Sequence, residues 1–457
     1  MTVIEMRKAV KEGKVTAMEL VTQSLEKIEE RKDLKAVIHI NPSVFREAKS
    51  VDEDDDDDKG IIGGVPILLK DNIDTGDSIP TSAGSVALAN NFSLSDADGI
   101  DPLRCEGAMI IGKANMTEFA NYMCDFRLDE RMPNGYSSRG GQTLHPTHSD
   151  ADPSGSSTGS AVAVAAGLVP AAIGSETYGS IISPSQQCGV VGIKPSDGLI
   201  SKEGVIPISF TLDTLGPITT NVEDAALILS IMSGKEYKME QKPEDITVGI
   251  VRTGLDNEKW PPKEWIKANE GLIPIIKKSG INVKDLPDGE LAQYAPGSGG
   301  DSFVFSIMRY EFQYSINNYL SKQNEYRKNA DNPKNLKEII AFNEENKDIA
   351  LKYGQGNLIA ASEISDGWKN EKEYIEALKQ RKTAIAVLDS YFDKHEADVL
   401  MLVSAHCGLA AATGFPSITL PIGKDEKGLP IGCLFMARRF KEDVLLAFAK
   451  MVESAIK

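Results

Sequence analysis

The sequence predicts an α/β protein, and three observations support this. The chain has 457 residues, of which 41% are hydrophobic, so either two domains or one large α/β domain is expected. From Ile61 onward, short apolar runs separated by Gly, Ser and Asn alternate with Ala-rich stretches, as strands and helices do in an α/β core. Residues 300–395 are instead rich in Glu, Lys, Asn and Tyr at helical spacing. They are predicted to form surface helices.

Residues 1–50 are predicted to form a helical arm that precedes the core. Apolar residues recur at helical spacing in two groups: Val3, Met6, Val10, Leu20, Val21, Leu25 and Ile28. Gly13 is expected to end the first helix, and Thr16 is expected to cap the second.

The next segment, VDEDDDDDKG at residues 51–60, is strongly acidic. Its like charges repel one another and it has almost nothing to bury, so a surface loop is expected. A calcium-binding loop is the alternative, but the segment lacks the interleaved ligand spacing and the bidentate Glu of such loops.

Several apolar runs predict the strands of the core, namely VPILLK (65–70), AMIIGK (108–113), VVGIKP (190–195), VLMLVS (399–404), SITLPIG (417–423) and IGCLFMA (431–437). The stretch from Ala161 to Ile173 contains Gly167 and Pro170, which predicts a buried helix with its exit turn. A closing helix is expected from Glu442.

Charge and cysteine content restrict the class of partner and the compartment. The formal net charge is −17 and the pI is about 4.9, which repels nucleic acid and anionic membrane surfaces. Five scattered cysteines without a C-x-x-C pair fit free thiols in a reducing compartment. The N-terminus lacks the apolar stretch of a signal peptide, and no run is long enough to span a bilayer. A cytoplasmic protein without nucleic-acid or membrane partners is expected.

Two motifs point to chemistry that their context disfavours. GAMIIGK at 107–113 has the spacing of a phosphate-binding loop, but Ala114 stands where a magnesium-binding Ser or Thr is needed. GSSTG at 155–159 matches a nucleophile elbow centred on Ser157, but that elbow must follow a strand. Here the preceding residues, HPTHSDADPS, predict a loop.

A stronger signal is the pairing of two Gly/Ser-rich loops, 154–161 and 174–185, around one predicted helix. Small residues let backbone N–H groups point into a cavity, where they stabilise an oxyanion. Lys70 ends an apolar strand, and burial there lowers the pKa of an amine toward that of a general base. Taken alone, such loops are more often linkers, and such a lysine more often reaches solvent.

These residues together resemble the amidase signature family. The matching segments are GGVPILLKDNI (63–73), GAMIIGKANMTEFAN (107–121), the stretch from 155 to 181, the stretch from 188 to 226, and GFPSITLPIG (414–423). RGGQT (139–143) and Glu176 are similar to the peptide-amidase branch, whose members remove the C-terminal amide of peptides.

The resemblance implies one α/β/α domain over residues 1–457, built around a large mixed, twisted sheet. Within it, residues 61–235 correspond to the signature core that carries the catalytic residues. Residues 300–395 then form a helical insert, and residues 396–457 form C-terminal strands and a helix.

The family's Ser-cisSer-Lys triad falls on Lys70, Ser156 and Ser180, with a cis peptide bond before Ser156. The resemblance implies that Ser180 attacks an amide carbon while Lys70 and Ser156 relay its proton. It implies no cofactor and no metal.

The same resemblance assigns the oxyanion hole to the backbone N–H groups of Thr177, Tyr178, Gly179 and Ser180. Tyr178 stands where the family usually has Gly or a small polar residue, and it is predicted to contact substrate together with Asn121 and Ser157.

The implied activity is hydrolysis of a carboxamide, either a peptide C-terminal amide or a small amide, to carboxylate and ammonia. One alternative is the amidase subunit of a tRNA-dependent amidotransferase, which the acidic charge balance disfavours. Another is a catalytically silent binding protein of the same fold, which the intact Lys70, Ser156 and Ser180 disfavour.

Overall fold

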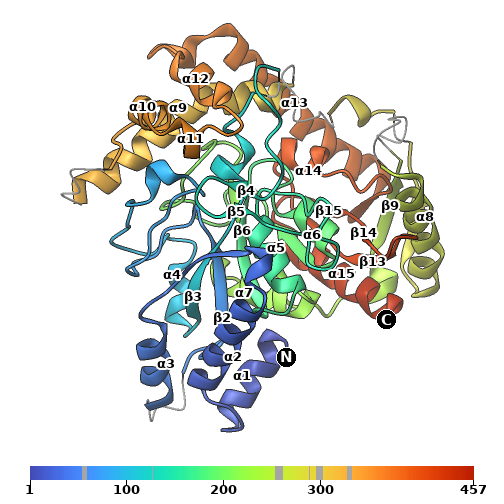
Figure 1. Ribbon diagram of the computed structural model, residues 1–457. Helices are drawn as coiled ribbons and strands as arrows, with labels where there is room; N and C mark the ends of the chain where they lie inside the picture. Colours follow the sequence, from blue (N-terminus) through green and yellow to red (C-terminus); the bar gives the residue numbers. More distant parts are fainter. Residues whose placement is uncertain (54–58, 126, 253–260, 288, 295–301, 327–331) are drawn as a thin grey trace.

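The computed structural model describes residues 1–53, 59–125, 127–252, 261–287, 289–294, 302–326 and 332–457. Its centre is an eleven-stranded mixed sheet in the order β1-β3-β2-β6-β8-β7-β12-β15-β11-β9-β10 (Figure 1). Strands β3, β2 and β6 run parallel to one another, as do β11, β9 and β10, and the other neighbours are antiparallel. The α/β prediction is confirmed.

The strands of this sheet are β1 (Val37–Ile40), β2 (Pro66–Lys70), β3 (Met109–Ala114), β6 (Ala171–Glu176), β7 (Val191–Lys194), β8 (Thr214–Thr219), β9 (Thr247–Val251), β10 (Asn282–Asp285), β11 (Val399–Leu402), β12 (Ser417–Thr419) and β15 (Phe435–Ala437). Two small ribbons pair β4 (Tyr136–Ser137) with β5 (Gly141–Gln142), and β13 (Pro421–Lys424) with β14 (Pro430–Gly432).

The α-helices are α1 (Val3–Lys11), α2 (Ala17–Glu30), α3 (Val44–Glu53), α4 (Asp101–Cys105), α5 (Thr158–Ala165), α6 (Ile182–Cys188), α7 (Val222–Ser233), α8 (Lys263–Lys278), α9 (Phe303–Tyr326), α10 (Leu336–Glu345), α11 (Lys347–Ala350), α12 (Gly356–Ser362), α13 (Lys372–His395), α14 (Gly408–Thr413) and α15 (Glu442–Ile456).

Strand β2 shows why the domain has three layers. Its five residues are all buried, so the strand is covered on both faces. Because side chains alternate along a strand, Ile67 and Leu69 enter a cluster shared with α1, α7 and α15, whereas Leu68 packs with residues of α2, α3 and α5. These two apolar layers on opposite faces of the sheet confirm the predicted α/β/α arrangement.

The N-terminal segment contains more than helices. Helices α1 and α2 bury the predicted apolar faces, and both begin at a capping box, with Thr2 and Thr16 as N-caps. Residues Val37–Ile40, however, form β1, which pairs with β3 at the sheet edge and was not predicted. The helical-arm prediction therefore holds for α1, α2 and α3 but not for the whole segment.

The acidic segment 51–60 is only partly a loop. Residues 51–53 continue helix α3, and Asp52 accepts hydrogen bonds from the backbone N–H groups of Ala17 (2.7 Å) and Met18 (3.0 Å) at the start of α2. This contact anchors two helices to each other. Residues 54–58, on which both the surface-loop and the calcium predictions fall, lie outside the described residues.

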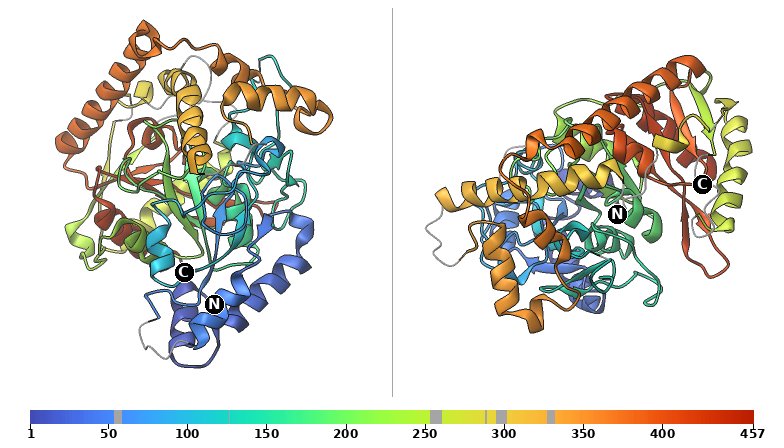
Figure 2. Two further views of the ribbon diagram at one scale, coloured as in Figure 1. Left: turned by 90° about the vertical axis from the view of Figure 1, so that its left-hand side faces the viewer. Right: turned by 90° about the horizontal axis from the view of Figure 1, so that it is seen from above.

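The predicted helical insert is confirmed by helices α9 to α13. Figures 1 and 2 place α10 and α12 at the opposite end of the molecule from α1 and α2. The long helices α9 and α13 pack against each other. Their buried residues form a second core, to which the segment around Met116 and Phe119 also contributes.

The C-terminal region contains the predicted strands and the closing helix α15. The runs 417–423 and 431–437 each divide between two sheets, because β12 and β15 join the main sheet while β13 and β14 form their own ribbon. Within the described part of the chain, no helix is both long and apolar enough to cross a membrane.

Candidate active site

Lys70 lies at the C-terminal end of β2 and is fully buried. Its Nζ donates hydrogen bonds to the Ser156 Oγ (2.8 Å) and to the Ser175 carbonyl oxygen (2.9 Å). Burial lowers the pKa of this amine to about 7, against the opposing charges of Glu176 and Asp213, which raise it. A large share of Lys70 is therefore neutral at physiological pH and can accept a proton.

Ser156 follows a cis peptide bond from Gly155, as the family resemblance implies. A Cβ on Gly155 would lie 2.4 Å from the Thr117 Oγ1, so only glycine fits there. The Ser156 carbonyl accepts a hydrogen bond from the Thr117 N–H (3.1 Å), and its side chain is fully buried. These contacts hold the Ser156 hydroxyl against Lys70.

Ser180 lies in the turn between β6 and α6, and its carbonyl accepts a hydrogen bond from the Ser157 N–H (3.1 Å). That bond joins the two Gly/Ser-rich loops. Ser180 also lines a pocket of about 280 Å³, together with Gly155, Thr177 and Tyr178. The structure thus brings the end of β2, which carries Lys70, together with the two loops that carry Ser156 and Ser180.

The second of these loops is shorter than predicted, because residues 174–176 belong to β6 and residues 182–185 to α6. Within the described residues, the backbone N–H groups of Thr177, Gly179 and Ser180 donate to no protein acceptor. Three free N–H groups in one turn beside a pocket are the geometry that an oxyanion hole requires.

Two neighbours hold this turn in shape. The Glu176 Oε2 accepts hydrogen bonds from the N–H groups of Ile181 (2.8 Å) and Ile182 (3.0 Å), and it thereby anchors the C-terminal end of the turn. Gly179 has a φ of +77°, and a Cβ there would lie 2.6 Å from the Cys407 Sγ. Glycine is therefore required at this position.

Asn121, one of the predicted substrate-binding residues, lines the pocket. It is the last of three consecutive non-glycine residues with left-handed backbone, after Phe119 and Ala120, a rare conformation that is often found at functional sites. Its Oδ1 is buried and has no hydrogen-bond partner among the described residues. This oxygen is available to accept a hydrogen bond from a ligand.

Tyr178 also lines the pocket, and its ring centroid lies 6.4 Å from that of His406. Burial raises the pKa of its hydroxyl far above the usual range, so Tyr178 can donate a hydrogen bond but does not act as an anion. Its ring, carried by the turn 177–180, forms part of the pocket lining.

Ser157 requires a correction. Its hydroxyl is fully buried, donates to the Ser175 carbonyl (3.1 Å) and accepts from the Ser175 N–H (3.3 Å). Both of its hydrogen-bonding functions are thus used by the β6 backbone. Ser157 fastens the first loop to the sheet, and its contacts leave no role in substrate binding.

The walls of the pocket contain residues that the sequence did not single out. The lining includes the apolar side chains of Ile208, Phe305 and Met308 and the polar side chains of Asp125, Arg127 and Asn357. Phe305 and Met308 come from α9 and Asn357 from α12, so the helical insert helps to build the site. No local motif marks these positions, because the fold alone brings them there.

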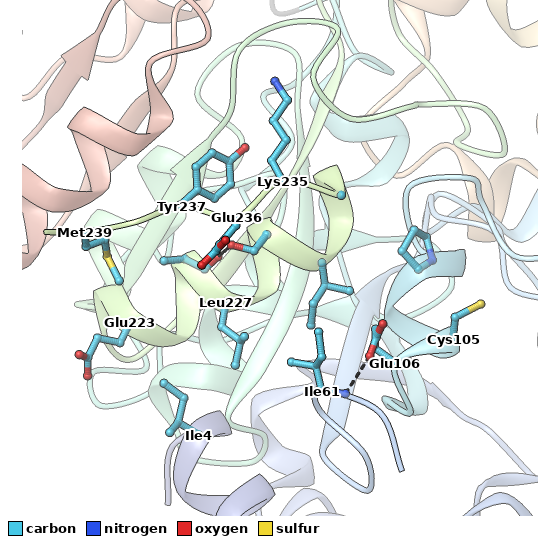
Figure 3. A pocket seen from close by; sticks show the side chains of 15 residues that line it. Ile4, Ile61, Cys105, Glu106, Glu223, Leu227, Lys235, Glu236, Tyr237 and Met239 are labelled. Carbon is cyan, nitrogen blue, oxygen red and sulfur yellow. Dashed lines mark hydrogen bonds between the residues drawn. The ribbon is translucent and has the colours of Figure 1, made fainter. Parts of the chain in front are cut away.

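A larger cleft, of about 720 Å³, lies elsewhere, between α1, α4 and α7 (Figure 3). Ile4, Leu227 and Met239 are among the mainly apolar side chains that line it, and Lys235 extends away from it. It contains none of the predicted site residues. The smaller pocket is therefore the candidate active site, since Thr177, Ser180 and Gly155 line it, and Gly155 directly precedes the Ser156 that contacts the buried Lys70 amine.

Among the described residues, no cluster of three or more His, Cys, Asp or Glu side chains could hold a metal ion. The five cysteines are free thiols, and only Cys105 is exposed. Burial raises the pKa of the Cys407 thiol, next to Gly179, to about 12, so it stays protonated.

Comparisons with known proteins agree with this geometry. The family model described as Amidase matches residues 19–263. A probable amidase of Arabidopsis thaliana is 33% identical over 99% of this chain and 90% of its own length. The glutamyl-tRNA(Gln) amidotransferase of Natranaerobius thermophilus has an A subunit that is 28% identical over 100% of this chain and 96% of its own length. The crystal structure of peptide amidase from Stenotrophomonas maltophilia superimposes with a TM-score of 0.87 at 30% identity, covering 99% of this chain and 96% of that one.

Proposed function

Because the chain belongs to the amidase signature family and is an amidase, we propose that it hydrolyses a carboxamide to a carboxylate and ammonia through an acyl-enzyme on Ser180. The observation that carries this proposal is the 2.8 Å hydrogen bond between the Lys70 Nζ and the Ser156 Oγ, made by an amine whose pKa is lowered to about 7. A base of that pKa is matched to proton transfer near neutral pH.

In the first half of the reaction, the Ser180 hydroxyl gives its proton to Ser156 as its oxygen attacks the amide carbon, and Ser156 gives its own proton to neutral Lys70. The free N–H groups of Thr177, Gly179 and Ser180 stabilise the oxyanion that forms. The carbon–nitrogen bond then breaks, and the relay returns the proton to the departing nitrogen. Ammonia leaves, and the acyl group stays bound to Ser180 as an ester.

In the second half, water attacks the acyl carbon and loses its proton through the same relay. The ester bond to Ser180 breaks, and the Ser180 oxygen regains that proton. The carboxylic acid product loses its own proton to solvent and is released as the carboxylate. Each relay residue passes protons in both directions, so all three residues are needed in both halves.

The substrate that we propose is the C-terminal amide of a peptide. The fold similarity to a peptide amidase over nearly the whole chain supports this class. The pocket offers the apolar side chains of Ile208, Phe305 and Met308 as contacts for the side chain of the last residue. The buried, unpartnered Asn121 Oδ1 offers an acceptor to an N–H group of the substrate.

The test is to measure ammonia release from N-acetylated, amidated dipeptides by the wild type, Ser180→Ala and Ser157→Ala. We expect Ser180→Ala to abolish release and Ser157→Ala to retain most of it, because the Ser157 hydroxyl contacts only the Ser175 backbone. Equal release by wild type and Ser180→Ala would show that Ser180 is not the nucleophile. Release from acetamide or propionamide but from no amidated peptide would point to a small-amide hydrolase.

The relatives that are amidotransferase A subunits favour a second candidate, delivery of ammonia to a partner that charges tRNA. The net charge of −17 counts against direct tRNA binding by this chain. Hydrolysis of glutamine that requires co-purified subunits and tRNA would support this candidate. Turnover of peptide amides by the purified chain alone would support the first.

A further inference from the structure

We propose that Glu311, on helix α9 of the insert, is a positioning residue for the turn 177–180. This turn carries the N–H groups assigned to the oxyanion in the proposed mechanism and is called the oxyanion turn below. This inference rests on the proposed function, because it assigns a role in the same reaction. Glu311 is fully buried, does not line the pocket and lies far from the signature segments in the sequence. It acts through other residues.

Glu311 receives four hydrogen bonds. Its Oε1 accepts from the Thr211 hydroxyl (2.6 Å) and the Tyr374 hydroxyl (2.8 Å), and its Oε2 accepts from the Thr211 N–H (3.0 Å) and the Ser209 hydroxyl. Hydrogen bonds to a carboxylate are stronger than those between neutral groups. Glu311 thus binds the segment 209–211 to α9 and, through Tyr374, to α13.

The same segment holds the oxyanion turn through Asp213. The Asp213 Oδ2 accepts from the N–H groups of Ile208 (2.8 Å) and Ser209 (2.9 Å), and its Oδ1 accepts from the Thr177 hydroxyl (2.6 Å). Thr177 is the first residue of the turn 177–180 and one of the three whose N–H groups have no acceptor among the described residues. A continuous path of hydrogen bonds therefore runs from Glu311 through Ser209 and Asp213 to Thr177.

This path gives the insert a role in the chemical step. Oxyanion donors act only if they stand within hydrogen-bond distance of the oxygen that becomes charged, and small displacements of such groups are costly. The Thr177 hydroxyl fixes one end of the turn, while Glu176 fixes the other through Ile181 and Ile182. Loss of the hydrogen bonds to the Glu311 carboxylate should impair transition-state stabilisation more than substrate binding.

Glu373, which is exposed, provides a control for the loss of a carboxylate that joins α9 and α13. It lies on α13 and accepts hydrogen bonds from the Ser306 hydroxyl (3.0 Å) and the Tyr310 hydroxyl (3.0 Å), both on α9. Like Glu311, it links α9 to a second element of the insert by accepting from hydroxyl groups. Its described contacts do not include the segment 208–213.

The experiment measures kcat and KM for an amidated dipeptide with Glu311→Gln and Glu373→Gln. We expect Glu311→Gln to lower kcat by at least about tenfold with KM within about threefold, since removal of one oxyanion donor costs about 100-fold or more. Glu373→Gln should change neither constant by more than about threefold. Equal kcat values for the wild type and Glu311→Gln would overturn the proposal.

A double-mutant cycle separates positioning from general loss of stability. If Glu311 acts through Thr177, Glu311→Gln should slow a Thr177→Val enzyme by less than about threefold, because the path is already broken. If its effect is purely structural, the two losses in kcat should multiply, and that result would also overturn the proposal. Glu373→Gln combined with Thr177→Val should give the product of the single effects.

Two further measurements keep the test decisive. If Glu311→Gln does not fold, Ser209→Ala breaks the same path while leaving Glu311 in place, and the same loss in kcat is expected.

If the wild type releases no ammonia, the proposed function fails. The rate at which a fluorophosphonate labels Ser180 then replaces kcat, because its phosphoryl oxygen needs the same N–H groups. An unchanged labelling rate in Glu311→Gln would overturn the positioning role.

Discussion

The ends of the neighbouring parallel strands β2 and β3 each carry a fully buried lysine, Lys70 and Lys113. Burial lowers the pKa of both amines. The Lys70 Nζ contacts the Ser156 hydroxyl, which stands beside the pocket. The Lys113 Nζ instead donates to the Thr81 Oγ1 (2.9 Å) and to the Ile73 carbonyl.

The charged surroundings of the two lysines also differ. Around Lys113, the charges of Asp71, Asp74, Asp77 and Asp96 all oppose the effect of burial on the pKa, so this amine lies among four carboxylates. Around Lys70, only Glu176 and Asp213 do so. Burial alone therefore does not make a catalytic base. Whether a buried lysine can serve as the proposed base depends on the hydroxyl beside its amine and on the number of nearby carboxylates.

The largest expected effect is that of Lys70→Met, which keeps the apolar stem and removes the amine. We expect kcat/KM for an amidated dipeptide to fall by about 10⁴-fold or more, as for loss of a residue from other hydrolase triads. Unfolding in urea should change little, because a buried amine is replaced by an apolar group. Residual activity within tenfold of the wild type would remove Lys70 from the mechanism.

The pH dependence of kcat/KM should follow Lys70. Its neutral form is the base, so activity should rise with pH, with a midpoint at about 7, and level off above it. Two units below the midpoint, about 1% of the amine is neutral, which predicts a loss of roughly 100-fold between pH 8 and pH 5.

Glu118 provides the control for this profile. Burial raises the pKa of its carboxyl to about 7 as well, but it accepts hydrogen bonds from the Ser138 N–H (2.7 Å) and hydroxyl (3.0 Å) and is not part of the relay. Glu118→Gln should leave the midpoint in place. A midpoint that disappears in this variant would assign the profile to Glu118 instead of Lys70.

Much of the contrast between the two lysines could be predicted from the sequence. The runs that end at Lys70 and Lys113 are both predicted as strands, and Ala114 argues against the phosphate-loop interpretation of the second. The resemblance then separated the two, because only Lys70 falls on a triad position. The roles proposed for Lys70, Ser156 and Ser180 stay predictions until they are measured.

What the sequence could not reveal depends on contacts between distant segments. Glu311 reaches the loop at Ser209 only because α9 packs beside it, and Glu311 itself lies outside the segments that match the family. The short strand β1 was missed since only four residues form it, at the sheet edge and among helices. Ser157 is predicted to bind substrate, but its hydroxyl donates a hydrogen bond to the Ser175 carbonyl of β6.

A smaller effect is expected from Glu176→Gln, which removes a charge that raises the pKa of Lys70. The midpoint of the pH profile should therefore move to lower pH. The maximal rate should also fall, by roughly tenfold, because the Glu176 carboxylate holds the N–H groups of Ile181 and Ile182. A midpoint that stays fixed or moves to higher pH would contradict the assignment of the profile to Lys70.

The smallest effect on catalysis, and the one that completes the comparison, is expected from Lys113→Met. Without this ammonium, the buried Asp71 and Asp74 lose the charge that lowers their pKa values against burial, and a buried charge without its partner costs about 3 kcal/mol. We expect the free energy of unfolding in urea to fall by about that amount, while kcat/KM per folded molecule stays within about threefold. If kcat/KM falls by more than tenfold while the free energy of unfolding is unchanged, Lys113 contributes to the chemistry. The proposed distinction between a catalytic Lys70 and a structural Lys113 would then be wrong.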